Sequence, residues 1–598
     1  MPQTSGLHTF HIPVMGLGYT VDTPLKVARF GISSVVSIMD DFLLEDMRRI
    51  HSKKLGLPFS PIAETEEDAR AKRVQAYLNL LNMGIQKQME DLKTENWENE
   101  GTMDYLVALL PEESEVSRLF EQFRTADPSE KSGLKSKIIG LLTPGSIDVN
   151  IMTKVDKLNY DKEGNALSRE FSDALSALRG FAKSDLEAAV VFSAGMNPAL
   201  YSYAEQFPDF FPNEKGEIKK RIILKVSDYR SALIQGKFLA KKGLWVSEFR
   251  VESGLNCGGH AFATDGFLAG PILEDFKTNR KELIETIRQT CNQGLAAKGQ
   301  AILPETETIK ITYQGGIGTG AEDSFLRNYY QLDGTGWGSP FLLVPEATSV
   351  DEGTIKKIIE AKRSDYFLSH ASPLGVPFNN LRTSSGEIQR KQRINKGRPG
   401  SPCFKKFLTF STEFTEKPIC TASRQYQNLK LKAFGEGKVS QQEITEILEK
   451  DCLCEGLSAP AILANGSAPR RNLNAVTICP GPNLAYFKSV FSLKEMVNHI
   501  YGRISLKLET DRPHVFVKEA QLYVDYLKKE FQKIIPETAA KQEAYLLKFR
   551  TNLSLGLSYY HDLVNTIKLD SEEILEKMKS QLKELQAEVE SLQPMISA

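Results

Sequence analysis

The sequence has almost no net charge, few cysteines for its length and no long apolar run. Its 75 Lys and Arg residues nearly balance 76 Asp and Glu residues in a chain of 598, so no overall field attracts nucleic acid or a membrane surface. No stretch approaches the ~20 consecutive apolar residues of a membrane span, and the first residues lack the basic and apolar segments of a signal peptide. Seven cysteines, an odd number, do not resemble a secreted disulfide framework. These absences favour a cytoplasmic protein without membrane or nucleic-acid partners.

Apolar, β-branched segments recur along much of the chain, and helix-patterned segments separate most of them. Alternating strands and helices predict a parallel α/β fold. The number of units favours a closed (β/α)8 TIM barrel, with an open doubly wound sheet as the alternative. The predicted strands lie in 10–22, 32–38, 149–155, 188–195, 220–227, 244–252, 308–316 and 339–347.

Other stretches interrupt this alternation, as expected for a chain longer than the ~250–300 residues that one core usually serves. Residues rich in Glu, Lys, Leu and Arg predict an inserted helical subdomain, and two further regions follow the barrel. The terminal helix is expected to pack on the barrel or on a second subunit, so a homo-oligomer through the C-terminal helices is one prediction. The predicted regions are 1–40 and 146–383 for the barrel, 41–145 for the insertion, 384–490 for a Cys-containing loop-rich region and 491–598 for a helical region.

Two glycine-bearing segments late in the predicted barrel suggest a phosphate site. Gly315 and Gly316 end one predicted strand, and Gly338 and Ser339 follow about twenty residues later. Bare backbone N–H groups and a helix N-terminus attract an anion, and TIM barrels often bind phosphate after strands seven and eight. Two tight turns that need positive φ are the alternative interpretation.

Four stretches, in order, give the chain a resemblance to a known family. KRIILKVSDYRSALIQGKFLAKKGLWVSEFRVESGLNCGGH (220–260) resembles the central strand–helix–strand unit of nitronate monooxygenases, the 2-nitropropane dioxygenase-like FMN enzymes. Residues 313–343 resemble that family's two phosphate turns, and PVMGLGYTVDTPLKVARFG and VNIM resemble its first strand with its loop and its Val-Asn strand. FMN-dependent enoyl-thioester reductases, which share this barrel type, resemble the chain about as well.

The resemblance implies an FMN-binding TIM barrel and assigns residues to it. His260 would be the base or proton donor beside the flavin, or, alternatively, a structural histidine after a turn. Lys225 would be a cation near the flavin ring. The implied cofactor-binding residues are Met15, Gly16, Asn150, Lys225, Gly258, Gly259, Gly315, Gly316, Ile317, Gly338 and Ser339.

Three functions remain open at this point. The first is a flavin-dependent oxidation of nitronate monooxygenase type, in which a histidine takes a proton from carbon. The second is an enoyl-thioester reductase that uses NAD(P)H and an acyl-carrier or coenzyme A substrate. The third is a barrel without catalysis that serves as a binding or assembly module. Cys257 and Pro340 depart from the residues usual in the resembled family, which leaves the substrate open.

Late cysteines and a basic run lie beyond the predicted barrel. Four cysteine thiolates form a ligand set for an iron–sulfur cluster or Zn²⁺, although the spacing is loose and small buried cysteines also pack as hydrophobes. A cluster beside a flavin would exchange electrons with it. The basic run is either a solvated face or a receiver for an anionic substrate. The cysteines are Cys403, Cys420, Cys452 and Cys454, and the run comprises Arg390, Lys391, Arg393, Lys396, Arg398, Lys405 and Lys406.

Overall fold

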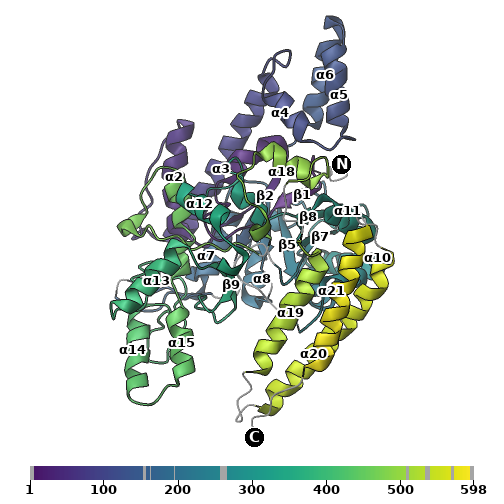
Figure 1. The fold of residues 1–598 in the computed structure, drawn as a ribbon. Helices are drawn as coiled ribbons and strands as arrows, with labels where there is room; N and C mark the ends of the chain where they lie inside the picture. The colour runs from purple at the N-terminus through teal and green to yellow at the C-terminus, as the bar shows by residue number, and fades with distance from the viewer. Residues whose placement is uncertain are drawn as a thin grey trace.

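A closed barrel of eight parallel strands stands at the centre of the computed structural model (Figure 1). The strands follow one another in chain order, and β1 closes the barrel by pairing with β8, where His11 lies opposite Gly336. This arrangement confirms the predicted (β/α)8 barrel. The structure describes residues 6–151, 156–161, 163–193, 195–255, 265–481, 483–506, 511–532, 539–566 and 572–592. The strands are β1 Phe10–Ile12, β2 Ser33–Ser37, β3 Ile147–Ile151, β4 Ala188–Phe192, β5 Lys220–Val226, β6 Val246–Glu252, β7 Lys310–Gln314 and β8 Gly334–Gly336.

The last strand lies earlier in the chain than the sequence pattern predicts. The apolar run 339–347 was expected to be this strand, but Ser339–Leu343 forms the 3-10 helix η4, and β8 is the short Gly334–Gly336. Pro340 has no N–H to donate to a strand ladder. All five residues of η4 are buried, so the apolar run reflects burial rather than strand pairing. The pattern of a short apolar run does not distinguish these two possibilities.

Helices α2 to α6 fill the stretch between β2 and β3, and a separate inserted subdomain at 41–145 stays a prediction. The first two of them pack against the barrel: Tyr77 of α3 donates a hydrogen bond to the carbonyl of Val21 at 2.7 Å. Helices α4 to α6 extend away from the barrel (Figure 1). The helices up to the barrel's end are α1 Thr23–Val27, α2 Asp41–Leu55, α3 Ala69–Thr94, α4 Thr102–Leu109, α5 Glu115–Thr125, α6 Pro128–Leu141, α7 Asp173–Ala182, α8 Pro198–Ala204, α9 Tyr229–Ala240, α10 Ala269–Ala297, α11 Gly320–Tyr329 and α12 Glu352–Glu360.

The remaining third of the chain packs back onto the barrel. Helices α19, α20 and α21 lie along α10 (Figure 1), with Phe516 stacked on Tyr560 at 4.5 Å between ring centres. The apolar stripe of α21 is buried within this layer, and the homo-oligomer stays a prediction. The elements are the antiparallel pair β9 Tyr366–Ser369 and β10 Phe378–Leu381, then α13 Ser385–Asn395, α14 Arg424–Gly435, α15 Gln441–Glu449, α16 Leu453–Gly456, α17 Ala459–Ala464, α18 Leu493–Ile500, α19 Val515–Phe531, α20 Ala539–Val564 and α21 Glu572–Ser591. Among the helices described, none has both the length and the apolar character needed to cross a membrane.

Candidate functional site

The interior of the barrel has an apolar half and a charged half. Strands β2, β4 and β5 contribute an apolar cluster, whereas β3 and β6 contribute ions. The Arg250 guanidinium lies 2.9 Å from an Asp148 oxygen and 2.8 Å from a Glu248 oxygen. Burial opposes ionisation of Glu248, but Arg250 outweighs it and lowers the pKa of Glu248 to about 2. A paired guanidinium satisfies these buried carboxylates and closes the barrel beneath its mouth.

A second polar layer lies one step nearer the carboxyl ends of the strands. Lys225 Nζ is 2.8 Å from Glu252 Oε2, and Gln314 donates to the other Glu252 oxygen at 2.7 Å. His11 lies 3.4 Å from Gln314 Oε1, and burial, helped by Arg250, lowers the pKa of His11 to about 3. The imidazole is therefore neutral, and Lys225 is the cation of this layer. Sequence reasoning found Lys225 but missed its partners, because they lie on other strands.

Asn150 lies at the same end of the barrel, on β3. Its side chain is almost fully buried, and its Oδ1 accepts a hydrogen bond from the Ser193 hydroxyl at 3.2 Å. The residue therefore stands on the inner wall at the mouth, as the resemblance implies. Contact with a flavin stays a prediction.

The two predicted glycine turns meet at one cavity. It is a shallow hollow that leaves about 10 Å³ for the centre of a water-sized molecule and otherwise opens to solvent. Gly315 and Gly316 have φ values of +116° and +84°, a region that favours glycine. A Cβ on Gly316 would come within 2.6 Å of Leu255. The lining residues are Leu255, Gly316, Ile317, Gly336, Gly338, Ser339, Pro340 and Asn483.

Hydrogen bonds occupy the backbone carbonyls of the first glycine turn and leave its N–H groups available to a ligand. Asn483 donates to the carbonyls of Gly316 and Ile317, at 2.6 Å each, and Arg512 donates to the Gly316 carbonyl at 2.9 Å. Within the described part of the chain, the backbone N–H groups of Gly316, Ile317, Gly338 and Ser339 donate to no acceptor. Carbonyls are thus satisfied while donors are left at the cavity, which is the polarity that an anion requires.

The C-terminal extension fastens this turn through a buried ion pair. Arg512 reaches both Glu322 oxygens, at 2.7 and 2.8 Å, and both side chains are at most 5% exposed. Glu322 also accepts hydrogen bonds from the N–H groups of Gly318 and Val515. Burial raises the pKa of Glu322, but Arg512 outweighs it and lowers the pKa to about 2. Sequence analysis missed Asn483 and Arg512, because no short motif marks them and their partners lie more than 160 positions away.

Other predicted cofactor residues lie elsewhere or outside the described residues. Met15 is fully buried, and Gly16 has a φ of +56° in the loop after β1, where it packs against Leu457. Neither residue lines the cavity. Cys257, Gly258, Gly259 and His260 fall in 256–264, outside the described residues, and Leu255 in the cavity wall directly precedes them.

The four late cysteines lie in one neighbourhood. The Cys452 thiol interacts electrostatically with those of Cys403 and Cys454, and so does the Cys420 thiol. Even so, no group of three or more His, Cys, Asp or Glu side chains among the described residues is arranged to hold a metal ion. An iron–sulfur or zinc site therefore stays a prediction to which the structure adds no support.

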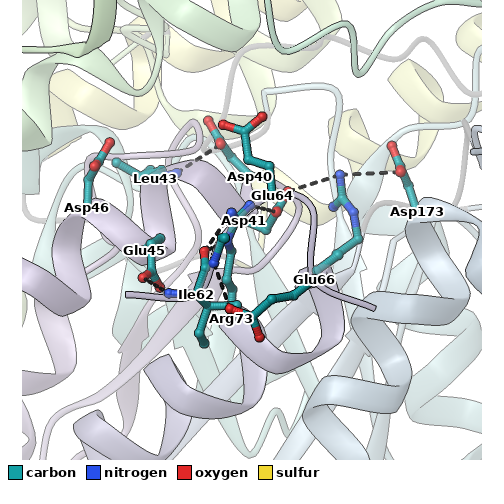
Figure 2. A network of polar contacts seen from close by, with 12 residues as sticks. Asp40, Asp41, Leu43, Glu45, Asp46, Ile62, Glu64, Glu66, Arg73 and Asp173 are labelled. Carbon is teal, nitrogen blue, oxygen red and sulfur yellow. Dashed lines mark hydrogen bonds and ion pairs between the residues drawn. The ribbon is translucent and has the colours of Figure 1, made fainter. Parts of the chain in front are cut away.

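Part of the basic run is used inside the molecule. Lys405 Nζ lies 2.6 Å from an oxygen of Asp40, which also caps α2 by accepting from Leu43 N at 3.0 Å. Figure 2 shows Asp40 beside this helix, with Asp41 and Arg73 adjacent to it. Arg390 and Arg393 are likewise ion-paired, with Glu387 and Asp451, whereas Lys391, Lys396, Arg398 and Lys406 are exposed.

Comparisons with known proteins add little to this site. No family model matches the sequence, and no curated protein matches it. Among solved structures, FabK from Thermotoga maritima is 12% identical, over 68% of this chain and 85% of that chain, with a TM-score of 0.30. The enoyl reductase domain of MlnA from the macrolactin biosynthesis cluster of Bacillus amyloliquefaciens is 14% identical, over 73% and 89%, with a TM-score of 0.31. Likenesses this weak carry no functional argument, and the barrel rests on its own strand pairing.

Proposed function

We propose that the protein is an FMN-dependent oxidoreductase whose cofactor phosphate binds between the two glycine turns. The supporting observation is the set of N–H groups of Gly316, Ile317, Gly338 and Ser339, which find no acceptor among the described residues, at a cavity after the seventh and eighth strands. Backbone donors at such strand ends form phosphate sites in barrel enzymes. The sequence resemblance supplies the identity of the phosphate compound as FMN.

The residues present fit a phosphate group. Among the described residues, none of those that line the cavity carries a carboxylate that would repel an anion. Ser339 adds a hydroxyl, and the glycines leave room for close approach. A ring system attached to this phosphate would extend toward the mouth, where Asn150 and Lys225 stand. When bound, FMN would supply the capacity to accept and return electrons.

The chain's own residues at the mouth would orient and polarise a bound ligand. Lys225 is fixed by Glu252, which Gln314 holds in turn. A cation so fixed stabilises negative charge on a ligand above it, without the cost of reorganising at each turnover. By resemblance, His260 would move the substrate proton.

The first candidate reaction is oxidation of a nitronate, because the Lys225 ammonium suits an anionic substrate at the mouth. The second is reduction of an enoyl thioester with NAD(P)H. It is favoured by the exposed cations Lys391, Lys396, Arg398 and Lys406, which suit the phosphates of a carrier group.

Anaerobic spectroscopy separates these candidates. The purified protein should be yellow and should release FMN on denaturation, as identified by mass analysis. Bleaching by a nitronate but not by NAD(P)H would support the first candidate, and the reverse pattern the second. A colourless protein that takes up no FMN on reconstitution would overturn the proposal and favour a barrel that only binds partners.

A further inference from the structure

One face of helix α19 lies against the strand ends beside the cavity at the glycine turns. Val515, Glu519 and Tyr523 follow one another at four-residue spacing, which places them on the same side of a helix. A Cβ on Gly316 would come within 2.9 Å of Val515 Cγ2, and a Cβ on Gly254 within 2.5 Å of Tyr523 Cε1. This face of α19 therefore packs on the first glycine turn at one end and on the chain just after β6 at the other.

Glu519, midway along this face, joins α19 to the start of α10. Its Oε2 accepts hydrogen bonds from the N–H of Ala269 at 2.9 Å and from the Tyr560 hydroxyl at 3.2 Å. The Tyr560 hydroxyl in turn accepts from the N–H of Gly270 at 3.0 Å. The side chain of Leu268 does not cap α10, so Glu519 and Tyr560 supply acceptors that the first turn of a helix needs.

The junction at Glu519 is tightly packed. Glu519, Tyr523 and Tyr560 are each at most 1% exposed. Phe516 stacks on Tyr560 from one side, and a Cβ on Gly270 would come within 2.3 Å of Tyr560 Cε1. Because a close-packed interior transmits displacement rather than absorbing it, a change at Glu519 is expected to move α19 as a whole.

Glu519 is a buried carboxylate without a cation. Among the described residues, no Lys, Arg or His is paired with it, and the first turn of α10 has no titratable side chain. Tyr560 of α20 and Tyr313 of β7 face it, and burial raises the pKa of both hydroxyls well above the ordinary value. Burial raises the pKa of Glu519 to about 7. The neutral acid therefore fits this interface, whereas the carboxylate regains its hydration only by leaving it.

We propose that Glu519 is a positioning residue of the cavity at the glycine turns, which it acts on by fixing α19 to α10 and α20. Leu255 of the cavity wall directly follows Gly254, against which Tyr523 packs, and Gly316 of the same wall packs on the start of α19. With Glu519 neutral, α19 stays docked and the wall keeps its shape. With Glu519 ionised, α19 moves outward and the phosphate is held less tightly. The inference rests on the proposed function, because the ligand is the FMN phosphate.

The preference for FMN over riboflavin, measured at two pH values, tests this role. The full-length apoprotein is titrated with each flavin at about pH 5.5 and about pH 8.5, on either side of the pKa of Glu519. Glu519→Gln keeps an acceptor oxygen but cannot ionise. The phosphate of FMN titrates near pH 6 in both proteins, so their difference isolates residue 519. We expect equal preferences at the lower pH and, at the higher pH, a wild-type preference on the order of 10-fold below that of Glu519→Gln.

Two further variants control for folding and for general charge. Tyr560→Phe removes a donor to Glu519 and the acceptor of the Gly270 N–H, so its preference for FMN should fall several-fold at both pH values. Glu584→Gln neutralises an exposed carboxylate of α21, in the same layer of helices, and should behave as the wild type does. Hydrogen exchange at Ala269 and Gly270 in the apoprotein gives a readout without flavin, and it should quicken with pH more in the wild type than in Glu519→Gln.

The outcomes separate this inference from the proposed function. A wild type that prefers FMN, with the same pH dependence as Glu519→Gln, would leave the proposed function intact and overturn the role of Glu519. A wild type without any preference for FMN would overturn the proposed function itself. Identical hydrogen exchange in the two proteins at both pH values would show that Glu519 does not hold α19 on α10, whatever the ligand.

Discussion

The two cavities outside the barrel core are built from different chemical groups. The cavity at the glycine turns presents backbone N–H groups, whose number does not change with pH. The cavity at Cys403 and Cys452 presents thiols together with the charged side chains of Arg393, Asp451 and Glu455. The first is therefore suited to retention of an anion, whereas the second offers no uniform polarity to a ligand. The C-terminal extension helps to form both.

Removing the buried cation behind the glycine turns should give the largest effect. Arg512→Ala leaves the Glu322 carboxylate buried without its partner, which costs about 3–5 kcal/mol. The Gly316 carbonyl also loses a donor, so FMN retention should fall together with stability. Chemical denaturation and cofactor analysis measure both. Wild-type stability and FMN content in Arg512→Ala would show that the extension does not support the turn.

A side chain at Gly316 should damage the same cavity from within. The positive φ and the 2.6 Å approach to Leu255 together cost Gly316→Ala about 3 kcal/mol, and the new methyl group would displace the phosphate. Gly397→Ala is the matched control, because Gly397 has a φ of +65° with nothing within 4 Å. The control should lose about 1 kcal/mol and keep its FMN. Equal FMN loss in both variants would mean that strain, not crowding, decides binding.

The ion pair of Glu322 also predicts how stability depends on pH. Its pKa is lowered from 4.5 to about 2 in the folded protein, so its stabilising contribution is present above pH 4.5 and is lost as pH falls toward 2. Unfolding of the wild type across this window should therefore become easier as pH falls. In Arg512→Ala the dependence should flatten. Parallel curves for the two proteins would contradict the pairing.

Substitution of Lys225 should lower turnover while having the smallest effect on stability among these variants. Lys225→Met leaves Glu252 without its cation and costs about 1–3 kcal/mol, whereas Lys225→Met with Glu252→Gln should recover most of that loss. Turnover should stay low in both variants, because the positive charge at the mouth is missing. Recovery of turnover in the double variant would show that Lys225 acts only through packing.

The sequence predicted the barrel well because parallel strands buried on both faces leave apolar runs that recur with helices between them. It also predicted the meeting of Gly316 with Gly338, since successive strand ends share one edge of a barrel. It missed β8 itself, where Gly334–Gly336 has no apolar signal. It missed Asn483, Arg512 and Glu252 because hydrogen bonds between distant segments leave no periodic trace.

The late cysteines are a second case in which the sequence pattern does not determine which residues contact one another. Their loose spacing left open whether they converge, and the structure places Cys403 and Cys452 in the wall of one cavity. The pattern held no information on whether the thiols surround a metal or contact one another. The Ser401–Asp451 hydrogen bond, which ties these two segments together, likewise joins residues far apart in the chain and leaves no trace in the sequence.

Relative affinity for FMN and riboflavin tests the central claim most directly, because the two differ only in the phosphate. If backbone donors of the two glycine turns hold that phosphate, the apoprotein should bind FMN on the order of 100-fold more tightly than riboflavin, and Gly316→Ala should abolish most of the difference. Equal affinities in the wild type, or a preference that survives in Gly316→Ala, would contradict the account.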